Sequence, residues 1–383
     1  PEHTFNLHGS DADGSDRWLM YSHAGLDRPP DEVYYLDPGH PNVVDYTLAI
    51  YAELATRYDL DGLHLDRIRY PGESWGYNPI SVARFQAETG REDHPDPLDG
   101  QWLQWRRDQV TALVRKVYLT VTAINPRLRI SAALSAAGSP PTGVDTWQTR
   151  RPYAQHLQDW RGWLEEGILD QGLPMIYRNE DTHAGQFDGW IEWAKDHQYS
   201  RGVVLGTGLY HNTVENSMSQ WKRIRQPSGL GNQGLGICGY SYATPSNSAT
   251  TRRGFVNAVV TDLFTQPACV PGIPWRDSPV LGHVMGTLVP QLPCLASADG
   301  QVLRLSGPQS RTLLTDGSGW FGAVGLPPGE YQLTLENPVC NESISVPLTV
   351  IAGAVTELRV VVPGSSPLSE YLYLPLVAER ASR

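Results

Sequence analysis

The stretch from Tyr58 to Pro71, YDLDGLHLDRIRYP, constrains the fold of this chain more than any other segment. Its apolar-alternating part predicts a buried β-strand, and polar side chains follow directly after it: Asp66, Arg67, Arg69 and Tyr70. In α/β barrels the chemistry takes place where such strands end, so Asp66 is a candidate catalytic carboxylate. The alternative interpretation is that Asp66 only pairs with one of the neighbouring arginines and fixes the loop.

Apolar runs separated by helical patterns continue along the chain. Buried strands are predicted at residues 62–66, 128–134, 168–177, 202–209 and 234–242. Apolar residues at helical spacing predict helices at residues 42–58, 102–124, 187–198 and 214–225. This alternation predicts an α/β fold with five βα units, whereas a complete (β/α)8 barrel needs eight strands.

Several motifs carry a resemblance to a known family. YDLDGLHLDRIRYPG, preceded by YLDPGHP at 35–41, closely resembles glycoside-hydrolase-like family 10, which consists of bacterial (β/α)8 barrel enzymes. Further matches follow in the order and spacing of that family: WRRDQV at 105–110, LDQGLPMIYRNE at 169–180, GTGLY at 206–210 and GLGICGYSYA at 234–243. The resemblance covers roughly residues 3 to 265 and implies a partial TIM (β/α)8 barrel with glycosidase chemistry.

The position of the motifs bears on the start of the barrel. In the resembling proteins, the elements found here at His8-Gly9 and Trp18-Leu19 follow the third strand, and the motif around Asp66 corresponds to the fourth. The resemblance therefore implies that residues 1–265 form a glycoside hydrolase-like barrel that lacks its first strands. The alternative is a complete but shorter α/β domain that begins with an irregular loop.

The C-terminal part of the chain has a different pattern. Residues 266–279 are rich in proline and predict a linker. Residues 280–363 predict a small antiparallel β-sandwich, with short alternating strands separated by Gly and Pro turns at residues 282–288, 301–305, 311–314, 320–324, 330–335, 344–350 and 355–361. TDGSGWF at 315–321 and GLPPGEY at 325–331 resemble the carboxypeptidase regulatory-like, prealbumin-like sandwich. Residues 364–383 form a tail that either adds an edge strand or acts as a terminal sorting or packing segment.

Composition limits the classes of partner. A net charge of -11 argues against nucleic acid as a partner, and no apolar stretch approaches the roughly 18 residues of a membrane span. Twelve Trp and eighteen Tyr can stack on sugar rings, although most aromatic residues are expected in the core. The four cysteines lack metal-site spacing, and no cofactor is predicted. We expect a Cys294–Cys340 disulfide in the small β domain and a buried free thiol at Cys238.

Glycoside hydrolysis requires two carboxyl groups, which we expect at the carboxyl ends of strands. Asp66 and Glu180 are the predicted catalytic pair, because each lies at or after the carboxyl end of a predicted strand, whereas Asp61 and Asp170 lie at the start of theirs. The resemblance matches both predicted residues to acids of the family. The candidate substrate contacts project from strands or their loops: His64, Arg69, Tyr70, Tyr177, Tyr210 and Tyr240. His64 is equally compatible with a role in the barrel core, and half of the tyrosines can be packing residues.

Two functions remain open from the sequence. The first is a glycoside hydrolase that cleaves O-glycosidic bonds of a polysaccharide or a peptidoglycan-type glycan by a two-carboxylate mechanism. The resemblance implies that such a protein is secreted or at the bacterial cell surface. The second is a catalytically inactive carbohydrate-binding or cell-surface protein on the same scaffold. A fold alone does not decide between them.

Overall fold

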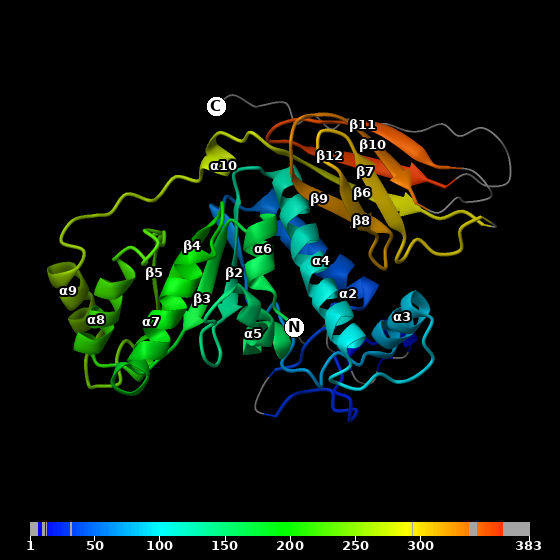
Figure 1. Cartoon of the computed structure of the whole chain (residues 1–383). Coiled ribbons are helices and arrows are strands. Elements are labelled where there is room, and N and C mark those ends of the chain that lie inside the picture. The colour runs from blue at the N-terminus through cyan, green and yellow to red at the C-terminus, as the bar shows by residue number, and fades with distance from the viewer. Residues whose placement is uncertain are drawn as a thin grey trace. The chain divides into compact units, whose positions relative to one another are not determined.

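A computed structural model describes residues 7–9, 12, 14–30, 33–292, 294–336 and 343–362 of this 383-residue chain (Figure 1). The described residues form two compact units, and each is assembled from separate segments of the chain. The first unit draws on residues 1–61, 74–128 and 274–383, and the second on residues 62–73 and 129–273. The predicted tail at 364–383 lies outside the described residues.

The second unit contains a five-stranded parallel sheet whose strands follow one another in chain order. The strands are β1 (Gly62–Leu65), β2 (Arg129–Ser135), β3 (Gln171–Ile176), β4 (Gly202–Gly208) and β5 (Gly236–Tyr240). All five match predicted strands. Sequential parallel strands connected through helices are the arrangement found in part of a (β/α)8 barrel, so the predicted fold class is confirmed.

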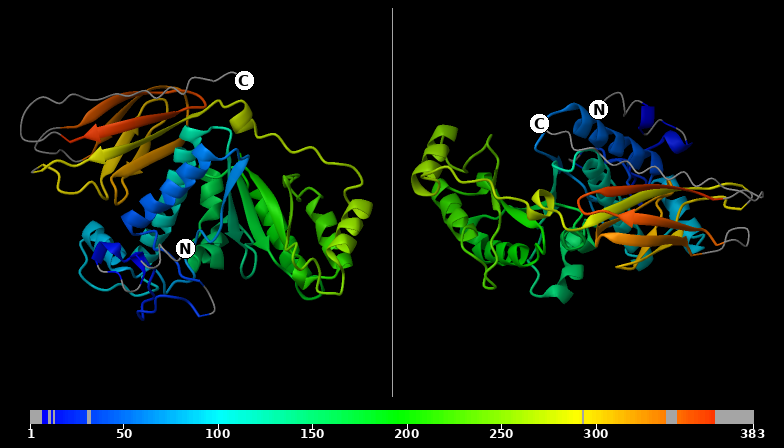
Figure 2. Two further views of the ribbon diagram at one scale, coloured as in Figure 1. Left: turned by 180° about the vertical axis from the view of Figure 1, so that it is seen from behind. Right: turned by 90° about the horizontal axis from the view of Figure 1, so that it is seen from above.

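Four helices of the second unit pack on this sheet (Figures 1 and 2): α5 (Arg151–Ala154), α6 (Trp160–Glu166), α7 (Glu180–Asp196) and α8 (Val214–Ile224). Helix α9 (Arg252–Asp262) packs on α8, and the short turns are η2 (Val144–Thr149) and η3 (Leu209–His211). Asp159 caps α6, and Gly167 ends it with a φ of 88°, a left-handed conformation that favours glycine. Four fully buried tryptophans fill this layer: Trp147, Trp160, Trp163 and Trp190.

The two faces of the parallel sheet differ in exposure. In β1, Leu63 and Leu65 are buried, whereas His64 between them is exposed. In β3, Ile176 is buried and Met175 is half-buried, with the same alternation along the strand. Successive side chains of a strand point to opposite faces, so the helices cover one face and the other keeps contact with solvent.

The first unit contains three long helices, α2 (Pro41–Arg57), α3 (Pro79–Thr89) and α4 (Gly100–Ile124), with the short elements η1 (Gly14–Asp16) and α10 (Pro274–Asp277). Local capping explains where the long helices begin. The side chains of His40, Asn78 and Asp99 each accept a backbone N–H of the first turn. Helix α4 packs on α2, and a cluster of buried aromatic residues fixes α3: Tyr77, Phe85, Trp102 and Trp105.

The first unit also contains the β-sandwich. Its strands are β6 (Gly282–Val289), β7 (Val302–Ser306), β8 (Arg311–Leu314), β9 (Trp320–Leu326), β10 (Gly329–Leu335), β11 (Ser345–Val350) and β12 (Val355–Val361), and all match predicted strands. They form a sheet of order β11-β10-β7-β8 and a sheet of order β12-β6-β9. The sandwich is antiparallel as predicted except for one pair: β12, which follows β11 through a turn at Gly353 (φ 73°), runs parallel to β6.

The cysteines follow the expectations as far as they are described. Cys294 is disulfide-bonded, and its predicted partner Cys340 lies outside the described residues. Cys238 is a free thiol as predicted, but it is half-buried and not fully buried. None of the helices in the described part of the chain is long and apolar enough to cross a bilayer.

Candidate functional site

Asp66 directly follows β1 at the carboxyl edge of the parallel sheet. The residue is exposed, and its Oδ1 accepts a hydrogen bond from the Arg67 backbone N–H at 2.8 Å. Arg67 has a φ of 53°, in the left-handed region that residues other than glycine rarely adopt. A sharp turn therefore follows the strand, and the carboxylate of Asp66 remains accessible to a ligand.

His64 projects from the exposed face of β1 towards the next strand. Its Nδ1 lies 2.9 Å from the hydroxyl oxygen of Ser131, its register partner on β2. The ring keeps contact with solvent, yet surrounding atoms desolvate it and lower its pKa, while the negative charge of Asp66 opposes that shift. His64 and Asp66 therefore act on each other electrostatically at one end of the strand.

Three tyrosines gather where β3, β4 and β5 end. Tyr177 stacks on Tyr240 with ring centroids 5.4 Å apart and an interplanar angle of 10°. Tyr210 meets both rings edge to face, at 6.2 Å from Tyr177 and 6.1 Å from Tyr240. Tyr240 is 55% exposed, and its peptide bond to Ser241 is cis. The three rings form an aromatic cluster with one open side.

The aromatic cluster and Asp66 share one electrostatic environment. Burial raises the pKa of Tyr177 well above its usual range, and the neighbouring Cys238, Tyr210, Tyr240 and Asp66 act in the same direction. Burial also raises the pKa of Tyr210. Asp66 at β1 thus influences both His64 and Tyr177 across the sheet. We call the set of His64, Asp66, Tyr177, Tyr210 and Tyr240 the strand-end cluster.

Two predicted substrate contacts in the loop after β1 differ in position. Arg69 is partly buried, and no acceptor for its Nη1 exists among the residues that the structure describes. This Nη1 atom is itself buried, so Arg69 does not present this donor to solvent. Tyr70 is fully buried, and its backbone N–H donates to the His156 carbonyl at 3.0 Å, so it lies in the core beneath the loop.

Glu180, the second predicted catalytic carboxylate, is the first residue of α7. Its Oε2 accepts from Arg223 Nη2 at 2.7 Å and from Gln220 Nε2 at 3.2 Å, both on α8. Arg223 also donates to Asp188 at 2.7 Å. The side chain of Glu180 is 15% exposed, so its carboxylate ties two helices together. This placement gives Glu180 a structural role that its position after β3 did not predict.

Ser131 and Cys238 belong to the surroundings of the strand-end cluster, and sequence reasoning did not assign them to the site. Ser131 is half-buried on β2 opposite His64, and Cys238, half-buried like its neighbours on β5, lies opposite Gly206. The cross-strand partner of each residue depends on the register of the sheet. Register follows from the packing of the whole sheet and is not readable from one strand.

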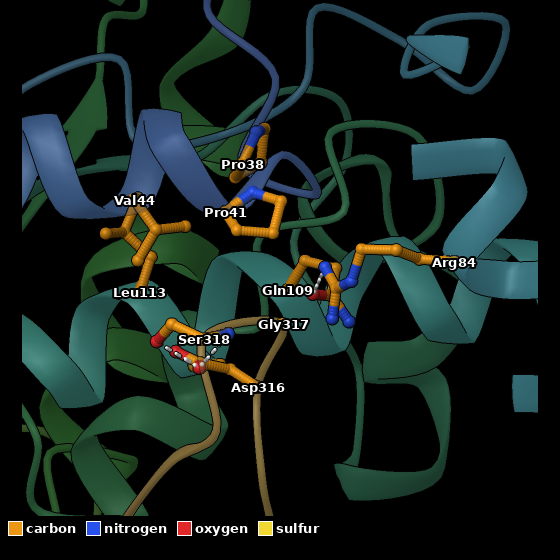
Figure 3. Close-up of a pocket in the computed structure, with 10 residues that line it drawn as sticks. Pro38, Pro41, Val44, Arg84, Gln109, Leu113, Asp316, Gly317 and Ser318 are labelled. Atoms are coloured by element: carbon orange, nitrogen blue, oxygen red, sulfur yellow. Dashed lines mark hydrogen bonds between the residues drawn. The ribbon is translucent and has the colours of Figure 1, made fainter. Parts of the chain in front are cut away.

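The first unit contains a small cavity that shares no residue with the strand-end cluster (Figure 3). It lies between α2, α4 and the turn at Asp316–Ser318, and its volume of about 10 Å³ matches a single water molecule rather than a sugar. Among the described residues, no group of three or more His, Cys, Asp or Glu side chains is arranged to hold a metal ion.

Sequence comparisons show which known proteins this chain is similar to. The family model described as Glycosyl hydrolase-like 10 matches residues 18–224. Glycosyl hydrolase YngK of Bacillus subtilis (strain 168) is 27% identical over 253 residues, which are 64% of this chain and 48% of YngK. Glycosyl hydrolase DigH of Escherichia coli (strain K12) is 30% identical over 187 residues, which are 46% of this chain and 39% of DigH. The chain thus spans less than half of either relative.

A solved structure gives a weaker likeness. The glycoside hydrolase domain of PgaB (BpsB) from Bordetella bronchiseptica aligns with a TM-score of 0.46 and 14% sequence identity. The alignment covers 63% of this chain and 68% of that domain.

Proposed function

This chain belongs to the Glycosyl hydrolase-like 10 family, and we propose that it hydrolyses O-glycosidic bonds of a polysaccharide or a peptidoglycan-type glycan outside the cell or at its surface. The observation that carries the proposal is the strand-end cluster. It combines an exposed carboxylate, Asp66, with an aromatic cluster at the edge of a parallel sheet where α/β barrel enzymes hold their substrates.

Asp66 is the proposed first member of the catalytic carboxyl pair. Its exposure and its position after β1 allow it to reach a glycosidic bond bound at the carboxyl edge of the sheet. Glu180 is the proposed second member, because it follows β3 at the same edge. In that role its carboxylate has to exchange the contact with Arg223 for one with the substrate.

The remaining side chains of the cluster suit a sugar ligand. Aromatic rings offer apolar faces on which sugar rings stack, and Tyr240 presents the most exposed ring of the three. Arg69, on the loop that follows Asp66, is a further proposed polar contact, and the loop has to move before its buried Nη1 can meet a glycan. His64, held by Ser131, supplies a further polar contact beside Asp66.

A binding protein without catalytic activity is the second candidate function. The observation in its favour is that Glu180 is already engaged by Arg223 and Gln220, which leaves Asp66 as the accessible carboxylate of the pair. A single carboxylate beside stacking tyrosines can recognise a sugar but lacks the second group of the two-carboxylate mechanism.

The test is hydrolysis of a panel of bacterial and plant polysaccharides, including deacylated peptidoglycan strands, by the wild type and by Asp66→Asn and Glu180→Gln variants. We expect Asp66→Asn to lower kcat at least a thousandfold without changing the thermal midpoint of unfolding. An equal loss in Glu180→Gln supports the pair. Glycan binding without product release by the wild type contradicts the enzyme proposal and supports the binding protein.

A further inference from the structure

Gln158 is a fully buried amide that joins the loop after β1 to the end of β2. It lies between α5 and α6 and has no exposed surface. Its Oε1 accepts the Ser135 backbone N–H at 2.7 Å, and its Nε2 donates to the carbonyls of Ala133 and Ile68, both at 3.1 Å. A glutamine amide has two donor hydrogens, and this one directs both to backbone carbonyls.

A second contact ties the loop after β1 to the segment of residues 156–158. The Tyr70 backbone N–H donates to the His156 carbonyl at 3.0 Å, two residues before Gln158. The His156 ring is itself held, because its Nδ1 lies 2.7 Å from the Ser135 hydroxyl. The loop that begins at Asp66 is therefore fixed by β1 on one side and by the 156–158 segment on the other.

Both segments contain a residue in an uncommon backbone conformation. Arg67, directly after Asp66, has a φ of 53°, and Leu157, directly before Gln158, has a φ of 50°. Left-handed conformations are unfavourable for residues with a side chain and persist only where the surroundings impose them. Leu157 is fully buried and anchors its segment in the core. The turn that presents Asp66 is thus maintained by tertiary contacts, since the local sequence does not favour it.

We infer that Gln158 is a positioning residue that holds the loop of residues 66–70 in the conformation presenting the Asp66 carboxylate. Its effect on catalysis rests on the proposed function, whereas its effect on the loop does not. Buried polar side chains are nearly always hydrogen-bonded, most often to backbone groups. Gln158 bonds to backbone groups of two separate segments: the carbonyl of Ile68, which lies two residues after Asp66, and two backbone groups of β2.

The test is amide hydrogen exchange of the full chain in the Gln158→Met variant, which keeps the length of the side chain and removes its polar atoms. We expect the Tyr70 amide to exchange at least tenfold faster than in the wild type, while the amide of Leu205 in β4 is unchanged. Gln155→Met is the matched control, because Gln155 lies three residues away and its side chain bonds to Arg151 instead of the loop.

Two outcomes contradict the inference: an unchanged Tyr70 amide, or an equal acceleration of all core amides, which indicates general destabilisation. If the Gln158→Met variant does not fold, the exchange rate of the Tyr70 amide in the wild type tests the inference instead. The Tyr70 amide then has to be as slow as the amides of β2, although it lies outside regular structure. Exchange at the rate of an unstructured peptide overturns the proposal.

The catalytic consequence is measured separately on a glycan that the wild type hydrolyses. Gln158→Met should lower kcat at least tenfold with KM within twofold, because the loop still binds substrate but presents Asp66 less often. A rise in KM with an unchanged kcat contradicts the inference that Gln158 positions the loop. If the wild type hydrolyses no glycan, the proposed function fails, and the exchange of the Tyr70 amide still decides the role of Gln158.

Discussion

At the scale of single residues, one buried carboxyl group of the first unit has a structural role. Asp37 is fully buried, and its two oxygens accept the backbone N–H groups of Gly39 and Asn78 at 2.9 and 3.2 Å. Burial raises the pKa of Asp37 from 3.8 to about 6, against the opposing effects of these hydrogen bonds and of the Arg106 charge. The motif YLDPGHP thus contributes a structural acid that titrates in the folded state.

This pKa predicts how stability depends on pH. The folded protein holds the Asp37 proton more tightly than the unfolded chain, so the contribution is fully present below about pH 4 and is lost as pH rises through about 6. Its size is on the order of 2 to 3 kcal/mol, from about 1.4 kcal/mol for each tenfold change in proton affinity. Urea unfolding between pH 4 and 7 should show a flatter profile for Asp37→Asn than for the wild type.

Glu88 provides the control for this experiment. Burial raises its pKa to about 6 as well, so the wild-type profile contains both contributions. A Glu88→Gln variant should retain the slope that is due to Asp37. Parallel profiles of the wild type and Asp37→Asn would falsify the assignment of the slope to Asp37.

Tyr240 permits a prediction about ligand binding at the same scale. Its ring is 55% exposed and stacks on Tyr177, so Tyr240→Ala removes a sugar-stacking surface and little buried area. We expect about a tenfold loss of affinity for a bound oligosaccharide, or about 1.4 kcal/mol, measured by calorimetry. Tyr58→Ala is the control, since Tyr58 is 57% exposed and lies outside the aromatic cluster. Equal losses of affinity in both variants contradict the proposed stacking of a sugar on the aromatic cluster.

At the scale of elements, one arginine makes two ion pairs between α8 and α7. Arg223 on α8 donates to Glu180 and Asp188 on α7, each at 2.7 Å, and its guanidinium carbon lies 5.4 Å from the ring centroid of Phe187. Neighbouring Lys222 pairs with Asp262 on α9 at 2.7 Å. Both partners of that second pair are about half exposed, and exposed ion pairs contribute little.

The two ion pairs should therefore differ in their effect on stability. Arg223→Met leaves the carboxylate of Glu180 largely buried without its cation, and we expect a loss of about 1 to 3 kcal/mol in the free energy of unfolding by urea. Lys222→Met, one residue away on the same helix, should change it by less than about 0.5 kcal/mol. Equal losses in the free energy of unfolding for the two variants mean that Arg223 does not hold α7 and α8 together.

At the scale of the whole molecule, residues distant in sequence meet within the first unit. Lys116 on α4 is buried, and its Nζ donates to Asp316 at 3.1 Å and to the Ser318 hydroxyl at 2.9 Å, in the turn before β9. Arg84 on α3 makes a two-pronged contact with Asp299 at 2.6 and 2.7 Å. These charges join the sandwich to helices that the predicted domain boundaries assign to the barrel.

A double-mutant cycle can test this coupling. Lys116→Met leaves the carboxylate of Asp316 partly desolvated without its cation, and we expect a loss of about 3 kcal/mol in the free energy of unfolding. Asp316→Asn keeps an oxygen for the turn contacts with Ser318 and Trp320 and removes the charge. In the double variant the loss should be smaller than the sum of the two single losses by at least about 1 kcal/mol. Strict additivity contradicts a direct Lys116–Asp316 coupling.

The sequence alone determined the strands, four of the helices and the edge of the sheet at which we propose the site. Apolar periodicity located the five parallel strands and the seven sandwich strands, because alternation and helical spacing are local properties of the chain. It also placed Asp66 and the three tyrosines at strand ends, and parallel strands in chain order bring those ends to one edge. The family motifs indicated the same site.

Only the tertiary structure decided which side chains are free to act. The engagement of Glu180 by Arg223 depends on how α7 packs on α8, and the burial of Tyr70 depends on the segment at His156. Gln158 lies between two short helices with no pattern that reveals its three backbone contacts. Burial and hydrogen-bond partners arise from residues far apart in the chain, so local periodicity can locate a residue but cannot assign its partners.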